Sequence, residues 1–440
     1  MGAFRHRDFR LLWFGALFSF LGNWIQNVAQ GWLVYDLTGD KAKLALIAFT
    51  SSVPVLLFGP LAGTIADYFD KRRLLIVCQT VFAAGAGFLA FVTARGIVEF
   101  WHILLVAGTS GLASTVEMPV RQSIVSRVVP REDLGSAIPL QALTFNGARL
   151  VGPAVGGVLL AYFGPQVCYA VNALTYSGLV FAAMAIRANL APTPQAIAGV
   201  IYSVTQGARH TLRDRRLRTL WWMEALVSGF GLTYLILMPA IARDVLGLGE
   251  KGLGMAMTTI GVGAIAALLL GVRLADSPRR TTFLRWAMTV MGLGLLVLST
   301  VTSPYVAFPL FAILGFAVVT QFNTTNTMFQ VLAPEALRGR VLAMHIWAIS
   351  GLGAVGNLGM GWLAEQTSIQ TSVAISGSVV LIGAGIAWTK RRAFAELREA
   401  LAVRRSQFDG NGESPPPPAP TRASGGGPGI GRDGSRRRPW

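Results

Sequence analysis

The chain has 440 residues, of which 53% are hydrophobic and only 13% are charged, so it carries more apolar surface than a water-soluble fold can bury. Its formal charge of +17 would suit nucleic-acid binding in a soluble protein, but the Lys and Arg residues gather in loops between apolar runs, which favours a membrane protein. Cys78 and Cys168 both lie inside apolar runs, which excludes a disulfide framework and a thiolate metal site.

Apolar runs of membrane-spanning length recur along the chain. A helix needs about twenty mostly apolar residues to cross a bilayer, where only an internally hydrogen-bonded backbone is stable. The basic stretch MGAFRHRDFR is short, and the run behind it has no cleavage site, which predicts a retained first span. The sequence predicts an all-α membrane protein with twelve transmembrane helices, at 10–34, 44–66, 74–94, 101–120, 139–162, 166–187, 219–241, 252–275, 282–301, 305–327, 342–364 and 370–389.

The first span carries four amide side chains on one stripe. They occupy positions i, i+3, i+4 and i+7, which share one face of a helix: Asn23, Gln26, Asn27 and Gln30. Polar groups do not face lipid without cost. The stripe is therefore predicted to line a water-accessible substrate cavity or, alternatively, to bond a neighbouring helix.

The loop after the second span, GTIADYFDKRR, combines a glycine, an acidic residue and paired basic residues. It resembles the signature loop of the major facilitator superfamily. The resemblance implies two bundles of six helices, and a cytoplasmic latch made by Gly63, Asp67, Arg72 and Arg73. Tyr68 and Asp70 depart from the family pattern, and a degenerate second copy, GVRLADSPRR, follows the eighth span. Simple anchoring of the loop by its charges is the alternative.

Ionisable residues at membrane depth point to coupling chemistry, because each charge at a helix centre costs about 3 kcal/mol. Glu117 and Arg121 lie one turn apart on the fourth span, and Arg149 lies on the fifth. A carboxylate that exchanges its proton as Arg groups approach or withdraw suits proton antiport, so these three residues are predicted to couple transport to protons. A permanent ion pair that braces the inner gate is the alternative.

The fifth span contains NGARLVGPAVGG, in which small residues allow close helix packing. This stretch resembles the exporter motif of the superfamily, which would assign that role to Gly152, Pro153, Gly156 and Gly157. General packing of small residues is the alternative.

Three stretches together resemble the bacterial secretion-effector branch, which includes enterobactin-type siderophore exporters and macrolide efflux proteins. They are the opening FRLLWFGALFSFLGNWIQNVAQGWLVYDLTG, the loop PVRQSIVSRVVPREDLGSA and the GPAVGG of the fifth span. The resemblance covers residues 4 to 390.

The chain divides into two related halves. Pro130, Gly135, Gly152 and Gly157 match Pro334, Gly339, Gly356 and Gly361 at one constant offset, as expected for a duplicated six-span unit. The predicted organisation is an N-terminal bundle (1–190), a basic amphipathic cytoplasmic linker (191–218) along the inner leaflet, a C-terminal bundle (219–392) and a disordered cytoplasmic tail (393–440) that starts with a helical turn or two. With both termini cytoplasmic, few basic residues fall near the outer face: Lys41, Lys43, Arg95, Arg243 and Lys251.

Other polar residues at membrane depth lie in the second half. Glu224 opens the seventh span, where pairing with Arg218 or Arg215 explains it more simply than a role in proton coupling, which is the alternative. Gln321, Asn323 and Asn326 on the tenth span are predicted to face the same substrate cavity from the opposite half. His345 at the inner side of the eleventh span is predicted to be structural, and titration near neutrality is the alternative.

Several motifs are missing from the sequence. It contains no phosphate-binding G-x-x-x-x-G-K-[ST] loop, no H-E-x-x-H, no G-x-S-x-G and no Cys–His cluster, so the chain is predicted not to be an enzyme and to need no cofactor or metal. The leading prediction is a monomeric inner-membrane exporter of a small amphipathic drug or siderophore, which exchanges its substrate for protons and binds no nucleic acid. A facilitator-type importer of a nutrient is the alternative, and a membrane enzyme or scaffold a more remote one.

Overall fold

The structure is a computed structural model that describes residues 2–192, 200–273, 280–334, 337–390 and 392–399. Within these ranges it is helical and contains no strand. Eleven helices are long and apolar enough to cross a membrane. The twelfth span is α1 (Arg7–Thr38), whose 32 residues are long enough but whose four amides lower its mean hydropathy. The prediction of twelve spans is confirmed.

The first six spans form one bundle. They are α1, α2 (Lys41–Tyr68), α3 (Lys71–Ala94), α4 (Phe100–Val128), α5 (Leu134–Phe163) and α6 (Pro165–Ala185). The turn between α1 and α2 shows how the sequence ends one helix and starts the next. Gly39 adopts φ +59°, and the carboxylate of Asp40 accepts hydrogen bonds from the backbone N–H groups of Ala42 (2.8 Å) and Lys43 (3.2 Å). Within the bundle, α1 packs on α5 and α6, α2 on α4, and α3 on α4 and α6.

The second bundle is less regular, because two of its spans contain π-helical turns. The seventh span joins α8 (Arg215–Leu226), the π-helical segment Val227–Gly231, α9 (Thr233–Ile236), α10 (Met238–Ala240) and the π-helical segment Ile241–Val245. The eleventh joins α14 (Arg338–Trp347), the π-helical segment Ala348–Leu352 and α15 (Gly353–Gln366). The regular spans are α11 (Glu250–Arg273), α12 (Arg280–Leu298), α13 (Pro304–Leu332) and α16 (Ile369–Thr389). The seventh span thus begins at Arg215, before the predicted 219.

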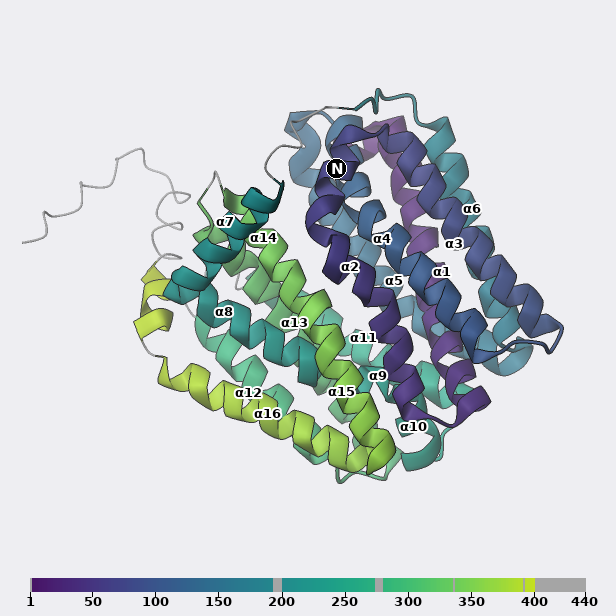
Figure 1. The fold of residues 1–440 in the computed structure, drawn as a ribbon, viewed down its shortest axis with the longest axis vertical. Helices are drawn as coiled ribbons and strands as arrows, with labels where there is room; N and C mark the ends of the chain where they lie inside the picture. The colour runs from purple at the N-terminus through teal and green to yellow at the C-terminus, as the bar shows by residue number, and fades with distance from the viewer. Residues whose placement is uncertain (1, 193–199, 274–279, 335–336, 391, 400–440) are drawn as a thin grey trace, which may run out of the picture.

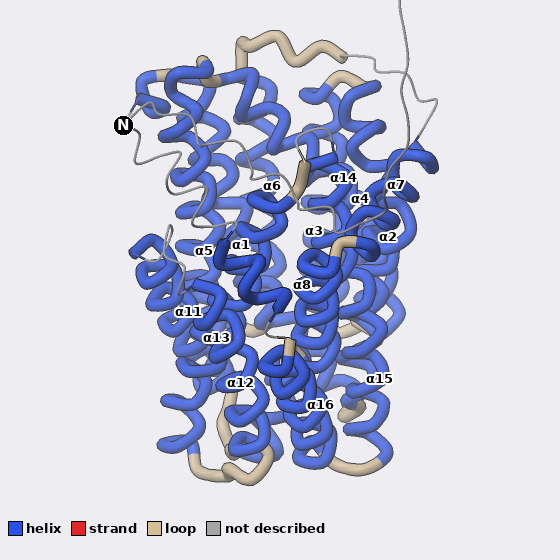
Figure 2. Tube along the Cα trace, turned by 90° about the vertical axis from the view of Figure 1, so that its left-hand side faces the viewer, coloured by secondary structure: helices blue, strands red, loops and turns tan. Residues whose placement is uncertain are grey.

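The two bundles stand side by side, with the first half of the chain in purple and blue and the second in green and yellow (Figure 1). Across the interface, α5 packs on α11 and α2 packs on α15. The long helices run along one common direction, with short connections at one end (Figure 2). We call the end that holds the N-terminus and α7 (Val200–Arg213) the linker end, and the opposite end, where α1 turns into α2, the distal end.

The outer surface is apolar, as expected for a protein solvated by lipid. Many large hydrophobic side chains point outward, among them Leu174 (72% exposed), Phe181 (67%), Leu269 (64%) and Ile382 (64%). In a water-soluble protein this amount of exposed apolar surface would drive aggregation, whereas in a bilayer it contacts acyl chains.

The linker and the end of the second bundle pack against the spans. Helix α7 lies against α14, where Gly207 closely approaches the backbone carbonyl of Arg340. Asp214 accepts hydrogen bonds from the backbone N–H groups at the start of α8; burial acts to raise the pKa of Asp214, but hydrogen bonds from Arg216 outweigh it and lower that pKa. Residues 392–399 are helical and bury Phe394 and Leu397. The rest of the predicted tail, from residue 400 on, lies outside the described residues.

Candidate functional site

A cavity of about 700 Å³ lies within the first bundle and extends along α1 from Phe9, near the linker end, to Gln30. Its walls come from all six helices of the first bundle, with Ile346 and Ser350 from the second bundle. The lining mixes amides with Phe20, Phe82, Phe145 and Met118. Pockets of this size and mixed character suit a small amphipathic molecule.

All four amides of the stripe on α1 line this cavity. The stripe also bonds the neighbouring α6: Asn172 Nδ2 donates to Gln26 Oε1 (2.7 Å), and the hydroxyl of Tyr176 donates to Asn23 Oδ1 (3.3 Å). The stripe therefore lines the cavity and also bonds a neighbouring helix, because Asn23 and Gln26 each accept a hydrogen bond from α6. The sequence analysis predicts no role for Asn172 or Tyr176, although these two residues also lie one turn apart on one helix.

Glu117 lies in the wall of the same cavity with two partners. Its Oε1 is 3.3 Å from Nε of Arg121 and accepts a hydrogen bond of 3.3 Å from Gln79 Nε2. Gln79 in turn accepts from Ser19 Oγ (3.4 Å) on α1. The side chains of Glu117 and Arg121 are only 8% and 13% exposed. A carboxylate with one cation and one amide donor, next to a cavity, can exchange a proton if the Arg121 contact opens.

The structure does not bring Arg149 to this cluster. Its guanidinium lies 5.8 Å from the ring centroid of Trp24 on α1, whereas the ion-pair partner of Glu117 among the described residues is Arg121. The guanidinium of Arg121 also stacks 4.1 Å from the ring centroid of Phe20. Adjacent spans in the sequence predicted proximity, but the direction in which each side chain leaves its helix decides which groups meet.

The glycines of the exporter-like stretch lie where α5 crosses two other helices. A Cβ added to Gly152 would lie 2.5 Å from Cβ of Trp24, and one added to Gly156 would lie 3.0 Å from Cα of Ile25, both on α1. A Cβ on Gly157 would lie 2.5 Å from Cα of Gly254 on α11, in the other bundle. Pro153 lies within the helix, and its carbonyl oxygen also borders Gly254. The stretch therefore brings both neighbours close to α5.

The signature loop is only partly described. Gly63 and Asp67 lie in the last turns of α2, and the side chain of Asp67 is outside the described part of the structure. Arg72 donates to the backbone carbonyls of Ile186 (2.6 Å) and Ala188 (3.2 Å), so it ties α3 to the end of α6 within its own bundle, and Arg73 is exposed. Asp70, a departure from the family pattern, accepts a hydrogen bond from the backbone N–H of Arg73 (2.9 Å) and caps α3.

This cap predicts a graded effect on stability. We expect Asp70→Ala to destabilise the protein by about 1 kcal/mol, because α3 loses its capping acceptor, whereas Asp70→Asn keeps most of the stability. Thermal unfolding in detergent compares the two variants. Equal melting temperatures for Ala and Asn would show that the cap does not contribute.

The three amides of the tenth span are not among the residues that line the cavity. Gln321 is buried, and neither polar atom of its side chain has a hydrogen-bond partner. Asn326 accepts a hydrogen bond from Gln330 on the same helix (2.5 Å), and Asn323 is exposed. They point in different directions because they occupy different faces of α13, which is packed between α11 and α12.

Glu224 pairs with His345 and not with the predicted arginines. His345 Nδ1 lies 2.5 Å from Glu224 Oε2, and both side chains are buried. Arg218 donates to the backbone carbonyl of Leu212 (3.2 Å), and Arg215 has no described contact with Glu224. The prediction was wrong because Glu224 lies more than two turns beyond Arg215 and points inward, toward the eleventh span.

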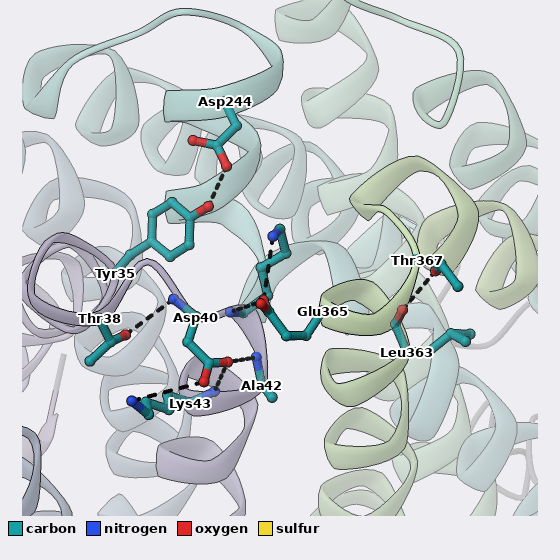
Figure 3. Close-up of polar contacts among 10 residues, drawn as sticks. Tyr35, Thr38, Asp40, Ala42, Lys43, Asp244, Leu363, Glu365 and Thr367 are labelled. Atoms are coloured by element: carbon teal, nitrogen blue, oxygen red, sulfur yellow. Dashed lines mark hydrogen bonds and ion pairs between the residues drawn. The ribbon is translucent and has the colours of Figure 1, made fainter.

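The distal end is closed by polar contacts between the bundles, which the sequence did not predict. Tyr35 donates a short hydrogen bond to Asp244 (Figure 3). Arg243 Nη1 lies 2.9 Å from Asp36 Oδ1, and Lys41 Nζ lies 3.4 Å from Glu365 Oε2. The backbone N–H of Lys41 also donates to Glu365 (2.9 Å). We call these the distal contacts. Among the described side chains, the ion pairs that join the two bundles lie at this end.

No group of His, Cys, Asp and Glu in the described part of the chain could hold a metal ion. Cys78 and Cys168 are both free and buried.

The sequence is similar to known membrane transporters over most of its length. A family model described as transmembrane secretion effector matches residues 1–409. Similar proteins include the staphyloferrin A transporter of Staphylococcus aureus, 25% identical over 81% of this chain and 90% of that protein. The multidrug efflux pump Tap of Mycolicibacterium fortuitum is 26% identical over 85% of this chain and 93% of its own length. Macrolide efflux protein A of Streptococcus pyogenes is 21% identical over the same shares, 85% and 93%.

Solved structures share the fold. A transporter of the POT family in complex with 5-aminolevulinic acid superposes with a TM-score of 0.73 at 12% identity, over 88% of this chain and 97% of that one. A bacterial homologue of the lysosomal transporter Spinster superposes with a TM-score of 0.68 at 13% identity, over 89% and 98%. The twelve-helix, two-bundle architecture is therefore that of known transporters.

Proposed function

This chain belongs to the transmembrane secretion effector family of major facilitator transporters, which are not enzymes, and we propose that it exports a small amphipathic molecule in exchange for protons. The observation that carries the proposal is the placement of Glu117, with Arg121 and Gln79, in the wall of a cavity that aromatic and amide side chains line. The names of the relatives favour a drug or a siderophore-like molecule as the substrate.

We propose that the linker end faces the cytoplasm, so that both termini are cytoplasmic and the protein lies in the cell membrane as a monomer. The basic residues of the signature loop and of the linker support this orientation, because positive charge favours the cytoplasmic side. The cavity reaches Phe9 near that end, and the distal contacts close the opposite end. The structure then corresponds to an inward-facing state of an alternating-access cycle in which residues 1–190 and 219–392 rock against each other.

Coupling follows from competition for Glu117. While Glu117 is ionised, its charge is balanced by Arg121; a proton taken up from outside neutralises the carboxyl group and frees Arg121 and Gln79 from it. A substrate that enters from the cytoplasm then favours the ion pair between Arg121 and Glu117. Because that pair requires an ionised carboxylate, its formation releases the proton from Glu117. Each cycle then moves one solute outward and at least one proton inward.

The proposal is tested in inverted membrane vesicles that contain the full chain. An imposed proton gradient should drive accumulation of a hydrophobic cationic dye or a siderophore, and collapse of the gradient by a protonophore should stop it. Accumulation that does not depend on the gradient would contradict antiport. Uptake by intact cells, lost with the gene, would instead favour import of a nutrient.

The distal contacts predict how the equilibrium between the two states responds to mutation. Exposed ion pairs contribute about 0.2–1 kcal/mol, so Lys41→Gln or Glu365→Gln should shift the ratio of inward- to outward-facing molecules by at most about fivefold. The double swap Lys41→Glu with Glu365→Lys should restore it in part. Labelling of single cysteines at either end with an impermeant maleimide, in a background without Cys78 and Cys168, measures the ratio.

A result in which both single variants and the swap label like the parent would show that this ion pair does not stabilise the inward-facing state. Lys390→Gln is a suitable control, because Lys390 is exposed and follows the last residue of α16, a helix of 21 residues that begins shortly after Glu365.

A further inference from the structure

Glu224 and His345 form a buried acid–base pair in the second bundle, apart from the cavity. Glu224 lies on α8 of the seventh span and His345 on α14 of the eleventh. The side chains are 0% and 4% exposed. One carboxylate oxygen, Oε2, contacts the imidazole, whereas the other, Oε1, is buried and has no hydrogen-bond partner. A carboxylate with a single donor in such surroundings is poorly compensated.

No second charge among the described residues balances the pair. Helices α13 and α16 and the π-helical segments Val227–Gly231 and Ala348–Leu352, which pack around α8, contain no Asp, Glu, Lys, Arg or His. On α13 the group that faces the imidazole is the ring of Phe329, with centroids 5.3 Å apart.

Charged residues on the remaining neighbouring elements are engaged elsewhere or lie near helix ends. Arg216 is held by Asp214 (2.9 Å), and Arg340 donates a short hydrogen bond to Gln206. On α12, Arg285 stacks on the rings of Trp388 and Phe394, and Arg280 donates a hydrogen bond to Thr327 Oγ1 (3.0 Å). The other ionisable groups on α2, α7, α8 and α14 are Lys41, Lys43, Asp67, Arg209, His210, Arg213, Arg215, Arg218 and Arg338. Among the described side chains, the ion-pair partner of Glu224 is His345.

The charge balance therefore depends on protons. A carboxylate next to a neutral imidazole carries one buried negative charge. When the pair binds one additional proton, on either the carboxylate or the imidazole, its net charge is zero. An uncompensated buried charge costs several kcal/mol, so loss of this proton should be accompanied by hydration or by separation of the two side chains.

The pair also lies where the seventh and eleventh spans change their helical geometry. The π-helical segments begin three residues after each partner, at Val227 and Ala348. They are joined by a hydrogen bond from Ser228 Oγ to the carbonyl of Ile349 (2.6 Å). Ile346, next to His345, lines the substrate cavity, so a small separation of the two helices would expose the pair to water there. π-Helical turns inside α-helices are frequent at functional sites.

We propose that Glu224 and His345 form a second proton-binding site, which takes up one proton from the cavity when the seventh and eleventh spans separate and releases it there when they separate again. The site deepens the proposed function, on which its role in transport rests. Protonated, the pair is neutral and the two spans dock; deprotonated, the remaining charge favours their separation. Proton occupancy of the second bundle thus sets how readily that bundle opens.

The site is tested with the full chain in proteoliposomes, labelled with ¹⁵N-histidine. The chain has four His residues, so the spectrum is simple, and His345→Asn assigns the signal. When the pH is varied from about 5 to about 9, we expect the imidazole signal of His345 to change, and Glu224→Gln to move the midpoint of that change. A signal that does not change over this range, or a midpoint unaffected by Glu224→Gln, would overturn the proposal.

A parallel measurement separates this site from the one at Glu117. Glu117→Gln should leave the titration of His345 unchanged, because no described contact joins the two clusters. If proton-driven transport is absent but His345 titrates with Glu224, the proposed function fails and the proton site stands. If transport is proton-driven but His345 does not titrate, the proposed function stands and the second proton site fails. Should Glu224→Gln fold poorly, Glu224→Asp provides the second variant, with a shifted midpoint expected and an unchanged midpoint against the proposal.

Discussion

Proton-driven export falls to the level of empty vesicles when Glu117 is replaced by Gln, whereas exchange of substrate for substrate without a proton gradient continues. The reason is that Gln keeps the size and the hydrogen bond to Gln79 but has no proton to exchange. The variant also lacks the carboxylate with which Arg121 forms its ion pair, so this pair can no longer break and form again during the cycle. Initial rates in inverted vesicles, with and without a gradient, measure the effect.

The matched control is Glu132→Gln, since Glu132 is an exposed carboxylate just before α5. It should transport like the parent. Equal gradient-driven rates for Glu117→Gln and the parent would show that the proton is carried elsewhere. Loss of both gradient-driven transport and exchange would point instead to a structural brace, the alternative function of the Glu117–Arg121 pair.

The second large effect is expected at the crossing of α5 and α11. Gly157→Ala adds a Cβ that would lie 2.5 Å from Cα of Gly254, and a backbone atom cannot rotate away as a side chain can. Overpacking of this kind costs about 1–3 kcal/mol, which reduces the population of the state seen here by roughly fivefold or more. Transport should fall accordingly, and Gly254→Ala should have the same effect, because its Cβ would lie 2.6 Å from Cα of Gly157.

Gly147→Ala on the same helix is the control, because a Cβ there meets nothing within 4 Å. It should be neutral or slightly stabilising, since Ala favours helix more than Gly does. Size-exclusion profiles in detergent distinguish a shifted equilibrium from misfolding. If both alanine variants of the crossing transport like Gly147→Ala, the two bundles do not meet tightly at this point.

Much of the architecture could be predicted from the sequence, because a bilayer imposes simple rules on length and polarity. The twelve apolar runs were long enough to cross, and the structure shows eleven helices of spanning length and hydropathy together with the 32-residue α1. The stripe on α1 was visible because four amides at helical spacing stand out in an apolar run, and all four line the cavity. Glu117 and Arg121 were recognisable for the same reason, since they lie one turn apart on one helix.

Contacts between distant parts of the chain could not be predicted in this way. Glu224 meets His345, and Tyr35 meets Asp244, at sequence separations of 121 and 209 residues. Which residue faces which depends on how the helices rotate and cross, and a local pattern carries no such information. The same limit explains why Arg149, Asn323 and Asn326 are not where their positions in the sequence suggested.

The cavity is shared very unequally by the two bundles. Every lining residue except Ile346 and Ser350 belongs to the first bundle. In a cycle that rocks the bundles, a bound molecule would therefore move together with the first bundle, while the second bundle would mainly control access to the cavity. Substitutions that change which molecules are carried should then concentrate in residues 1–190, and those that change only the speed of turnover should concentrate in residues 219–392.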